Sequence, residues 1–80
     1  MSSWTIYSKN QCPYCEKAKF ALKDEVDVTV KNISEDPRYL TELMERNPNA
    51  RTMPQIYRDK HCIGGYDQLI IVLATRCQEL

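Results

Sequence analysis

The chain has 80 residues, of which 42% are apolar and 28% are charged, and its eleven basic and eleven acidic residues cancel. This length fits one small domain, and this composition excludes the disordered and fibrous classes. A net charge of zero offers no bulk attraction to nucleic acid or to an anionic membrane, and the apolar stretches are too short to cross a bilayer. We therefore expect a single domain over residues 1–80, without a nucleic-acid or membrane partner.

The first predicted elements are a strand and a helix. Residues 4–8 are rich in aromatic and β-branched side chains and predict a strand with Trp4 and Ile6 on one face. Pro13 suits the first position of a helix, and a helical pattern runs from there to about residue 23. The residues expected on the inner face of this helix are Cys15, Ala18 and Leu22.

A second strand and a second helix follow. Valine alternates with polar residues over 26–31, which predicts a half-buried strand whose valines face the core. Asp36 followed by Pro37 is typical of a helix N-terminus, with a capping carboxylate before a proline in the first position. This helix is expected to end near Asn47. Its inner face is expected to hold Leu40, Leu43 and Met44.

The last third of the chain predicts a hairpin and a helix. Residues 54–58 and 61–63 predict two short strands joined by a tight turn, and the glycine pair that follows ends the second strand. Asp67 is expected to cap the last helix, whose inner face would hold Leu69, Ile70, Leu73 and Cys77. The order β-α-β-α-β-β-α predicts an α/β fold. Its four-stranded mixed sheet should have helices on both faces and a parallel first pair of strands.

The four cysteines decide which chemistry to consider. The first residues lack a basic segment followed by an apolar one, so we expect no secretory signal and a cytoplasmic location. In that reducing compartment, cysteines are more often catalytic, metal-binding or buried than disulfide-bonded. Cys62 and Cys77 are expected to be small apolar core residues, and His61 is expected to be an exposed strand residue.

Cys12 and Cys15 are separated by two residues and stand where a strand gives way to a helix. Cys12 lies at the predicted helix N-terminus, where free backbone N–H groups and the helix dipole stabilise a thiolate. Such placement lowers a cysteine pKa from about 8.5 into the range of roughly 3.5–7.5, and the thiolate is the form that attacks disulfides. Cys15 lies one turn further on, on the inner face. We therefore predict an exposed nucleophile, Cys12, and a buried resolving thiol, Cys15.

Three other interpretations of this pair compete with a redox role. A zinc site usually takes its four ligands from two close pairs, and the chain has only one, because His61 and Cys62 are adjacent in a strand and point to opposite faces. A structural disulfide would call for an exported protein. Two inert cysteines would make the placement at a helix end a coincidence.

Three segments carry a family resemblance. Residues 7–15, which include the motif CPYC, resemble the active-site segment of dithiol glutaredoxins. Residues 51–55 resemble the T-V-P loop of that family, with Met53 in place of the commoner valine, and residues 64–69 resemble its G-G-x-D-x-L segment. The motifs follow in the family's order, and the resemblance covers nearly the whole chain. The short length, Met53 and Tyr66 also resemble the compact glutaredoxins of bacteriophages.

The resemblance implies a thioredoxin fold and a glutathione-dependent thiol–disulfide oxidoreductase with Cys12 and Cys15 as its redox pair. Such an enzyme reduces protein disulfides and glutathione mixed disulfides. The resemblance implies glutathione as co-substrate, no bound cofactor or metal, and a monomeric state. Among protein partners, ribonucleotide reductase is the recipient of electrons that the resemblance most suggests.

The same resemblance implies a binding site for glutathione, an anionic tripeptide with two carboxylates and one ammonium. Lys9 and Arg46 can each offer a cation to a carboxylate, Arg46 to that of the glycine, and Arg51 is a further candidate. The helix N-terminus at Asp67 suits the γ-glutamyl carboxylate, and the Asp67 side chain suits its ammonium. A cis Pro54, which the family has, would leave the preceding backbone free to pair with an extended substrate. The residues expected to bind glutathione are Lys9, Tyr14, Arg46, Thr52, Met53, Pro54, Gly65, Tyr66 and Asp67.

Each of these assignments has a plainer alternative. The basic residues could be solvated surface charges, Asp67 a simple helix cap and Pro54 the start of a strand. The whole chain could be a thioredoxin-like redoxin reduced by a flavoprotein reductase, which would bind glutathione weakly. It could also carry an iron–sulfur cluster held by Cys12 and glutathione across a dimer, although the stiff CPYC turn and the competing Cys15 disfavour this.

Overall fold

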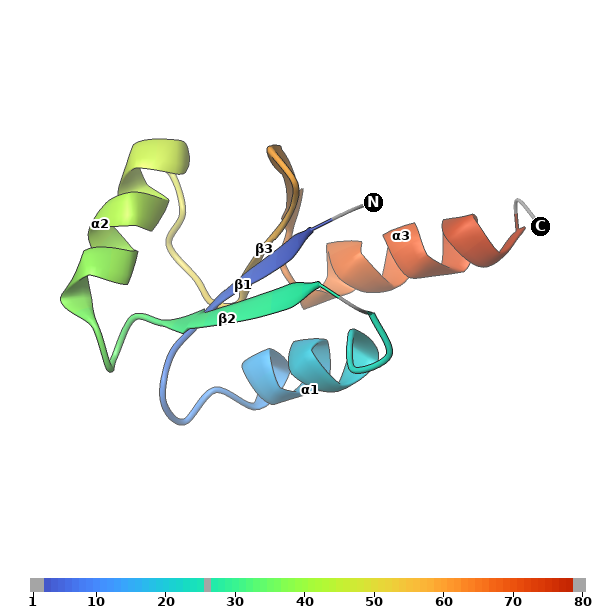
Figure 1. Ribbon diagram of the computed structural model, residues 1–80, viewed down its shortest axis with the longest axis horizontal. Helices are drawn as coiled ribbons and strands as arrows, with labels where there is room; N and C mark the ends of the chain where they lie inside the picture. The colour runs from blue at the N-terminus through green and yellow to red at the C-terminus, as the bar shows by residue number, and fades with distance from the viewer. Residues whose placement is uncertain (1–2, 26, 79–80) are drawn as a thin grey trace.

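The computed structural model describes residues 3–25 and 27–78, with side chains up to residue 75. Within these residues, helices and strands follow one another in the predicted order (Figure 1). The elements are β1 (Trp4–Ser8), α1 (Pro13–Ala21), β2 (Val28–Asn32), α2 (Pro37–Arg46), β3 (Gln55–Arg58), β4 (His61–Gly64) and α3 (Tyr66–Gln78).

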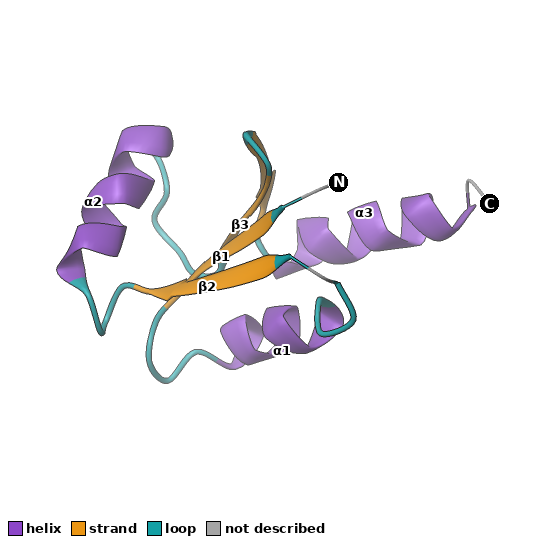
Figure 2. Cartoon of the chain, in the orientation of Figure 1, coloured by secondary structure: helices purple, strands orange, loops and turns teal. Residues whose placement is uncertain are grey.

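The described strands form one mixed sheet in the order β2-β1-β3-β4. β1 runs parallel to β2 and antiparallel to β3, and β3 pairs antiparallel with β4. α1 and α3 lie against one face of this sheet and α2 lies on the other side (Figure 2). The predicted α/β architecture is confirmed. Within the described residues, no helix has the length and apolar character needed to cross a membrane.

The larger core lies between the sheet and the pair α1 and α3. Trp4 and Ile6 point into it, as the alternation along β1 predicts, whereas Tyr7 points to the opposite face. The buried residues of this core are Trp4, Ile6, Ala18, Leu22, Ile56 and Leu69. Burial of one such large side chain stabilises the fold by about 1.5–3 kcal/mol. This packing holds α1 on the sheet, so the position of its N-terminus is set by the core.

The second core, beneath α2, is smaller and partly polar. Tyr7, Leu43 and Tyr57 are buried here, and the two tyrosine rings meet edge to face with their centroids 5.8 Å apart. The Tyr7 hydroxyl donates a hydrogen bond to the Glu42 carboxylate, and the Lys31 ammonium donates to the same carboxylate oxygen. The buried Leu43 and the hydrogen-bonded carboxylate of Glu42 are therefore among the contacts that attach α2 to the sheet.

This carboxylate makes stability depend on pH. Hydrogen bonds from Lys31 and from Tyr7 hold the pKa of Glu42 below its ordinary value of 4.5. A lowered pKa in the folded state contributes stability above the ordinary value, and that contribution is lost as the pH falls through the folded pKa. We expect Glu42→Gln to be less stable than the parent at neutral pH, with the difference shrinking as the pH falls below 4.5.

Urea unfolding followed by circular dichroism across this pH range measures the difference. The Glu42 side chain is 38% exposed, so solvent screens the interaction and we expect at most about 1 kcal/mol. Glu45→Gln, at an exposed position of the same helix, serves as the control. If the free energy of unfolding lost in Glu42→Gln stays constant with pH, the glutamate contributes through its shape and not through its charge.

Several apolar side chains predicted to face the core are exposed instead. Val30, Leu40 and Ile70 are each at least 40% exposed. β2 is an edge strand with a neighbour on one side only, which leaves Val30 uncovered. A helix on a four-stranded sheet buries only a narrow stripe, so Leu43 is covered in α2 and Leu69 in α3 while Leu40 and Ile70 lie beside the stripe. The predicted inner faces of these helices were therefore wrong for Leu40 and Ile70. They are confirmed for the buried Leu43 and Leu69, and the predicted Met44 and Leu73 pack, partly buried, against the same cores.

Other differences lie at element ends and at the cysteines. Cys62 is exposed on the edge strand β4, so its assignment to the core was wrong, whereas the exposed His61 is confirmed. α1 ends at Ala21, two residues earlier than predicted, because Leu22 already closes its last turn. The side chain of Cys77 and all of Val26 lie outside the described residues.

Candidate active site

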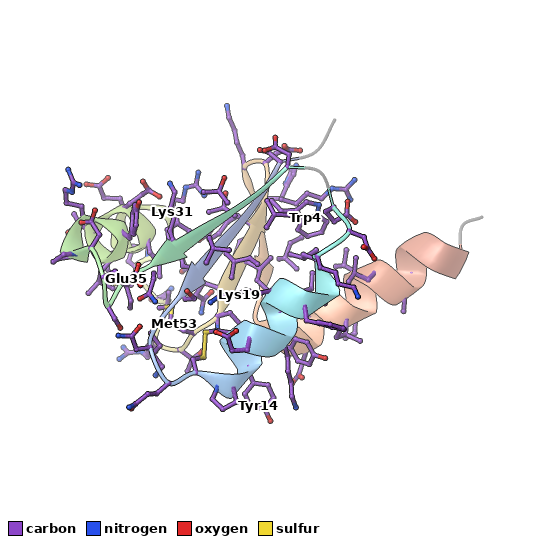
Figure 3. All side chains as sticks on the ribbon, turned by 60° about the horizontal axis from the view of Figure 1, so that its bottom comes forward. Trp4, Tyr14, Lys19, Lys31, Glu35 and Met53 are labelled. Carbon is purple, nitrogen blue, oxygen red and sulfur yellow. A yellow bond between two sulfur atoms is a disulfide. The ribbon has the colours of Figure 1, made fainter. Side chains whose placement is uncertain are left out.

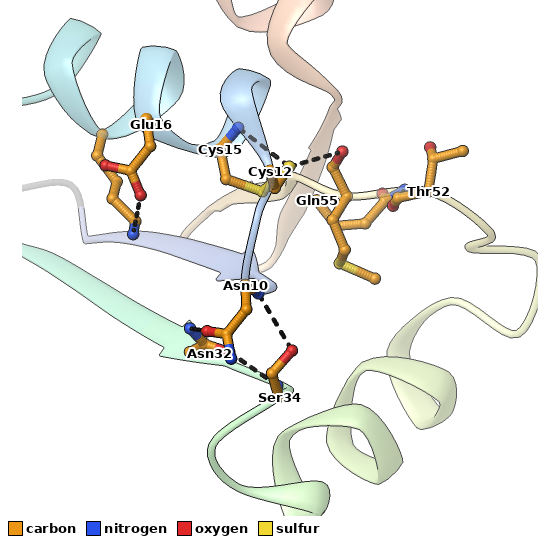
Figure 4. Close-up of a disulfide and its surroundings, with 10 residues drawn as sticks. Asn10, Cys12, Cys15, Glu16, Asn32, Ser34, Thr52 and Gln55 are labelled. Carbon is orange, nitrogen blue, oxygen red and sulfur yellow. Dashed lines mark hydrogen bonds and ion pairs between the residues drawn. A yellow bond between two sulfur atoms is a disulfide. The ribbon is translucent and has the colours of Figure 1, made fainter.

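Cys12 forms the junction between the loop after β1 and the first turn of α1. Its backbone is extended, with φ −120° and ψ 99°, and it serves as the N-cap of the helix, with Pro13 in the first turn. The Cys12 sulfur accepts a hydrogen bond from the backbone N–H of Cys15 at 3.2 Å (Figure 4). The cysteine therefore takes the place that a serine or aspartate usually takes at a helix start. When the pair is reduced, the same N–H and the helix dipole favour the thiolate of Cys12.

The two cysteines are joined in a disulfide, with their Cα atoms 5.2 Å apart. Cys15 is fully buried on the inner face of α1, as predicted. Cys12 is only 8% exposed, so the expectation of an openly exposed nucleophile was wrong in degree. The neighbouring Met53 loop covers it, and the Cys12 sulfur lies 3.6 Å from the Met53 carbonyl oxygen. Access to the sulfur is thus limited to one side.

The loop before β3, which includes Met53, faces the disulfide. The peptide bond between Met53 and Pro54 is cis, which confirms the expectation from the family resemblance. The buried Gln55 side chain donates a hydrogen bond from Nε2 to the Thr52 carbonyl at 2.8 Å, which ties the loop to β3. Figure 3 shows Met53 close to the yellow disulfide and Tyr14 at the same end of α1.

The N-terminus of α3 forms another wall. Gly64 has φ +114°, and a Cβ atom there would lie 3.1 Å from the Gln68 side chain, so this turn needs glycine. The Gln68 Oε1 atom accepts from the Gly65 N–H at 3.1 Å, while the Gly65 carbonyl accepts from Leu69 N. Gly65 is therefore the cap of α3, and Asp67, predicted to cap it, lies in the first turn instead.

A cleft of about 570 Å³ lies between these segments, within the range of about 300–1,000 Å³ usual for small-molecule sites. We call it the active-site cleft. It is lined by Lys9, Gln11, Cys12, Pro13, Tyr14, Arg51, Thr52, Met53, Pro54, Gly65, Tyr66, Asp67 and Gln68. Three segments that lie far apart in the sequence thus meet around one sulfur atom.

Two predicted site residues do not line the active-site cleft. Cys15 lies buried beneath its partner. Arg46, in the last turn of α2, is exposed and lies over the tyrosines of the second core, with its guanidinium carbon 4.9 Å from the centroid of the Tyr57 ring and 5.9 Å from that of Tyr7. Arg51, the less favoured basic candidate, does line the cleft. The structure therefore brings Lys9 and Arg51, and not Arg46, to the cleft that Cys12 lines.

The remaining lining residues were missed from the sequence. Gln11 and Pro13 flank Cys12 directly, and Gln11 has a positive φ of 56°, which turns the chain into the helix. Gln68 follows the cap residue Gly65 by three positions. This spacing is typical of a side chain that reaches back to the cap, and it was the available signal.

Two tyrosines form the outer wall of the active-site cleft. The rings of Tyr14 and Tyr66 are 5.9 Å apart, and Tyr14 is 56% exposed. The ammonium of Lys17 lies 5.0 Å from the centroid of the Tyr14 ring. This wall offers aromatic surface, and the cations among the lining residues are those of Lys9 and Arg51. Within the described residues, no group of three metal-ligating side chains gathers at this or any other place.

Comparisons with known proteins agree with this geometry. The glutaredoxin family profile matches residues 4–63. The chain is 42% identical over 69 residues to glutaredoxin 1 of Rickettsia bellii, which covers 80% of this chain and 69% of that protein. The structure of reduced Escherichia coli glutaredoxin superposes with a TM-score of 0.79 at 23% identity and covers 95% of this chain and 98% of that one.

A buckwheat glutaredoxin solved as a glutathione complex superposes with a TM-score of 0.62 at 23% identity, over 88% of this chain and 66% of that chain. These structures share the thioredoxin fold, which confirms the fold expected from the resemblance. The likeness to bacteriophage proteins stays a prediction. From the family match, the relatives and the helix-capping disulfide, we conclude that the chain belongs to the glutaredoxin family and is a dithiol thiol–disulfide oxidoreductase with Cys12 and Cys15 as its redox pair.

Proposed function

We propose that this glutaredoxin draws its electrons from glutathione bound in the active-site cleft and passes them to protein disulfides and glutathione mixed disulfides. The observation that carries the proposal is the meeting of one reactive sulfur with two cations and a helix N-terminus in one cleft of suitable size. Glutaredoxins use glutathione, and a homologous structure holds it.

Each part of glutathione has a complementary group in the cleft. Its thiol belongs beside the Cys12 sulfur, because that is where the mixed disulfide forms. Lys9 and Arg51 supply cations for the glycine carboxylate, since both line the rim. The first turn of α3 supplies N–H groups for the γ-glutamyl carboxylate, and the exposed Asp67 side chain supplies a partner for its ammonium. The N–H of Gly65 is already taken by Gln68, so Gly65 contributes space and not a donor.

The remaining lining residues orient the peptide. The backbone of Thr52 and Met53, before the cis Pro54, can pair with the extended cysteinyl residue of glutathione. Tyr14 and Tyr66 offer an apolar surface for it to pack against.

The reaction then follows from the asymmetry of the pair. The Cys12 thiolate attacks one sulfur of the target disulfide, and the other target sulfur leaves as a thiolate. Cys15 attacks the Cys12 sulfur, which releases the second target thiol and leaves the Cys12–Cys15 disulfide. One glutathione thiolate attacks Cys12 and frees Cys15. A second glutathione attacks the bound one, which yields glutathione disulfide and returns the Cys12 thiolate.

The family resemblance suggests ribonucleotide reductase as one protein target. The chemistry requires a reducing compartment such as the cytoplasm, and one chain supplies every group in the active-site cleft, so we propose that the monomer is active. An assay with glutathione, glutathione reductase and a small mixed disulfide tests the proposal. Turnover with thioredoxin reductase but not with glutathione would contradict it.

The cations of the active-site cleft allow a sharper test. We expect Lys9→Ala and Arg51→Ala each to raise the KM for glutathione roughly tenfold or more, because each removes a charge-assisted hydrogen bond of about 1.5–3 kcal/mol. Arg46→Ala is the matched control, because Arg46 does not line the cleft. Its KM should stay near that of the parent. If Arg46→Ala raises the KM and Arg51→Ala does not, the glycine carboxylate binds on the α2 side, as the family resemblance implies.

A further inference from the structure

A group of polar side chains ties the loop before Cys12 to the segment after β2. The Asn10 backbone N–H donates to the Ser34 hydroxyl oxygen at 3.1 Å, and the Asn32 side-chain amide donates to the Asn10 Oδ1 atom at 3.0 Å. The Ser34 backbone N–H donates in turn to the Asn32 Oδ1 atom at 2.7 Å, which orients that amide (Figure 4). We call Asn10, Asn32 and Ser34 the loop clasp.

The loop clasp begins where the sheet ends. The last backbone hydrogen bond between these segments runs from Ile33 N to the Ser8 carbonyl at 2.8 Å. Beyond Ser8, the chain leaves the sheet, and the next regular element begins at Cys12, the cap of α1. Between these two points, the loop clasp supplies the hydrogen bonds to the segment after β2.

The residues on either side of Asn10 belong to the active-site cleft. Lys9 and Gln11 are both exposed and both line it. A side chain that must be ordered when a ligand binds lowers affinity by the entropy lost, whereas a loop held in place beforehand does not. The loop clasp therefore acts on a cleft wall without touching the ligand itself.

We propose that Asn10, Asn32 and Ser34 are positioning residues that hold Lys9 in place for glutathione. This inference rests on the proposed role of Lys9 as a partner of a glutathione carboxylate. The clasp is separate from the groups that activate the nucleophile, because the N–H that bonds to the Cys12 sulfur belongs to Cys15. Loss of the clasp should weaken glutathione use and leave the reactivity of Cys12 unchanged.

The test is a double-mutant cycle between Ser34→Ala and Lys9→Ala. Ser34→Ala removes the acceptor for Asn10 N–H but keeps the backbone N–H that orients Asn32. We expect it to raise the KM for glutathione about three- to tenfold in the parent chain, the scale of one exposed hydrogen bond, and to have no further effect in Lys9→Ala. Asn10→Ala removes the other half of the clasp and should behave in the same way.

Two controls separate positioning from general loosening. Ser34→Thr keeps the hydroxyl and should restore the parent KM, and Thr41→Ala removes an exposed hydroxyl on α2 and should leave the KM unchanged. The pH midpoint of Cys12 alkylation by iodoacetamide should match the parent in every clasp variant.

The possible outcomes are distinct. An unchanged KM in Ser34→Ala, an equal effect in both backgrounds, or a shifted alkylation midpoint would each overturn the role of the clasp. A parent-like KM in Lys9→Ala would overturn the proposed role of Lys9 itself. Failure of the Lys9 role is thus measured in Lys9→Ala, and failure of the clasp role is measured in Ser34→Ala.

Discussion

A Cys12→Ser variant is expected to lose all thiol–disulfide exchange, whereas Cys15→Ser should still reduce glutathione mixed disulfides. Cys12 caps α1 and lines the active-site cleft, so it is the sulfur that a substrate can reach. A serine hydroxyl is not ionised at neutral pH and forms no disulfide, so it cannot take over the role of the Cys12 thiolate. Cys15 is fully buried and serves only where an intramolecular disulfide must form.

The second half of this prediction concerns trapped intermediates. Without Cys15, a second glutathione can still release the glutathione bound on Cys12, so the activity on small mixed disulfides remains. A protein target should instead stay attached to Cys12 as a mixed disulfide, which mass spectrometry under non-reducing conditions can detect. Cys62→Ser is the control, because Cys62 is an exposed free thiol on β4 and lies outside the active-site cleft.

Two results would contradict this assignment. One is a Cys12→Ser chain that remains active. The other is a Cys15→Ser chain whose adduct is found on Cys62 or Cys77. Either result would mean that the helix-capping position does not identify the nucleophile.

The second large effect is expected for stability. Leu43→Ala should lower the free energy of unfolding by about 2–5 kcal/mol, because it removes the buried leucine that packs α2 on Tyr7 and Tyr57. A small domain has only about 5–15 kcal/mol in total, so the thermal midpoint should fall by about 10 °C or more. Urea and thermal unfolding followed by circular dichroism measure both quantities.

Leu40→Ala on the same helix is the matched control. It removes the same atoms from a side chain that is 41% exposed, so the expected loss is well below that of Leu43→Ala. Equal losses in the two variants would mean that helix propensity, and not burial against the sheet, determines the cost. The comparison also tests whether Leu43, and not Leu40, carries the packing of α2 on the sheet.

Much of the fold could be read from local patterns. Alternation along residues 4–8 predicted which side chains of β1 face each core, and Asp36 with Pro37 predicted the start of α2. These features depend only on residues that are close together in the sequence, so local patterns are enough to predict them. The position of Cys12 at a helix start is of the same kind, and it was enough to predict the nucleophile.

Exposure could not be predicted in the same way. Periodicity states which residues share a face of an element, but not whether another element covers that face. Val30 and Cys62 were predicted to face the core and are exposed instead, because β2 and β4 are the edges of the sheet. The number and order of strands decide this, and both arise from pairing between distant segments.

The set of residues that line the active-site cleft also depends on how distant segments pack together. The sequence by itself determined the redox pair, the loop before β3 and the glycine turn, because each is a short motif with its own local geometry. Only the tertiary structure decided that Arg51 lines the cleft while Arg46 lies over Tyr57, and that Ser34 holds the loop of Lys9. The physical reason is that a long basic side chain can reach in several directions. The packing of α2 on the sheet, which no local pattern encodes, selects one of them.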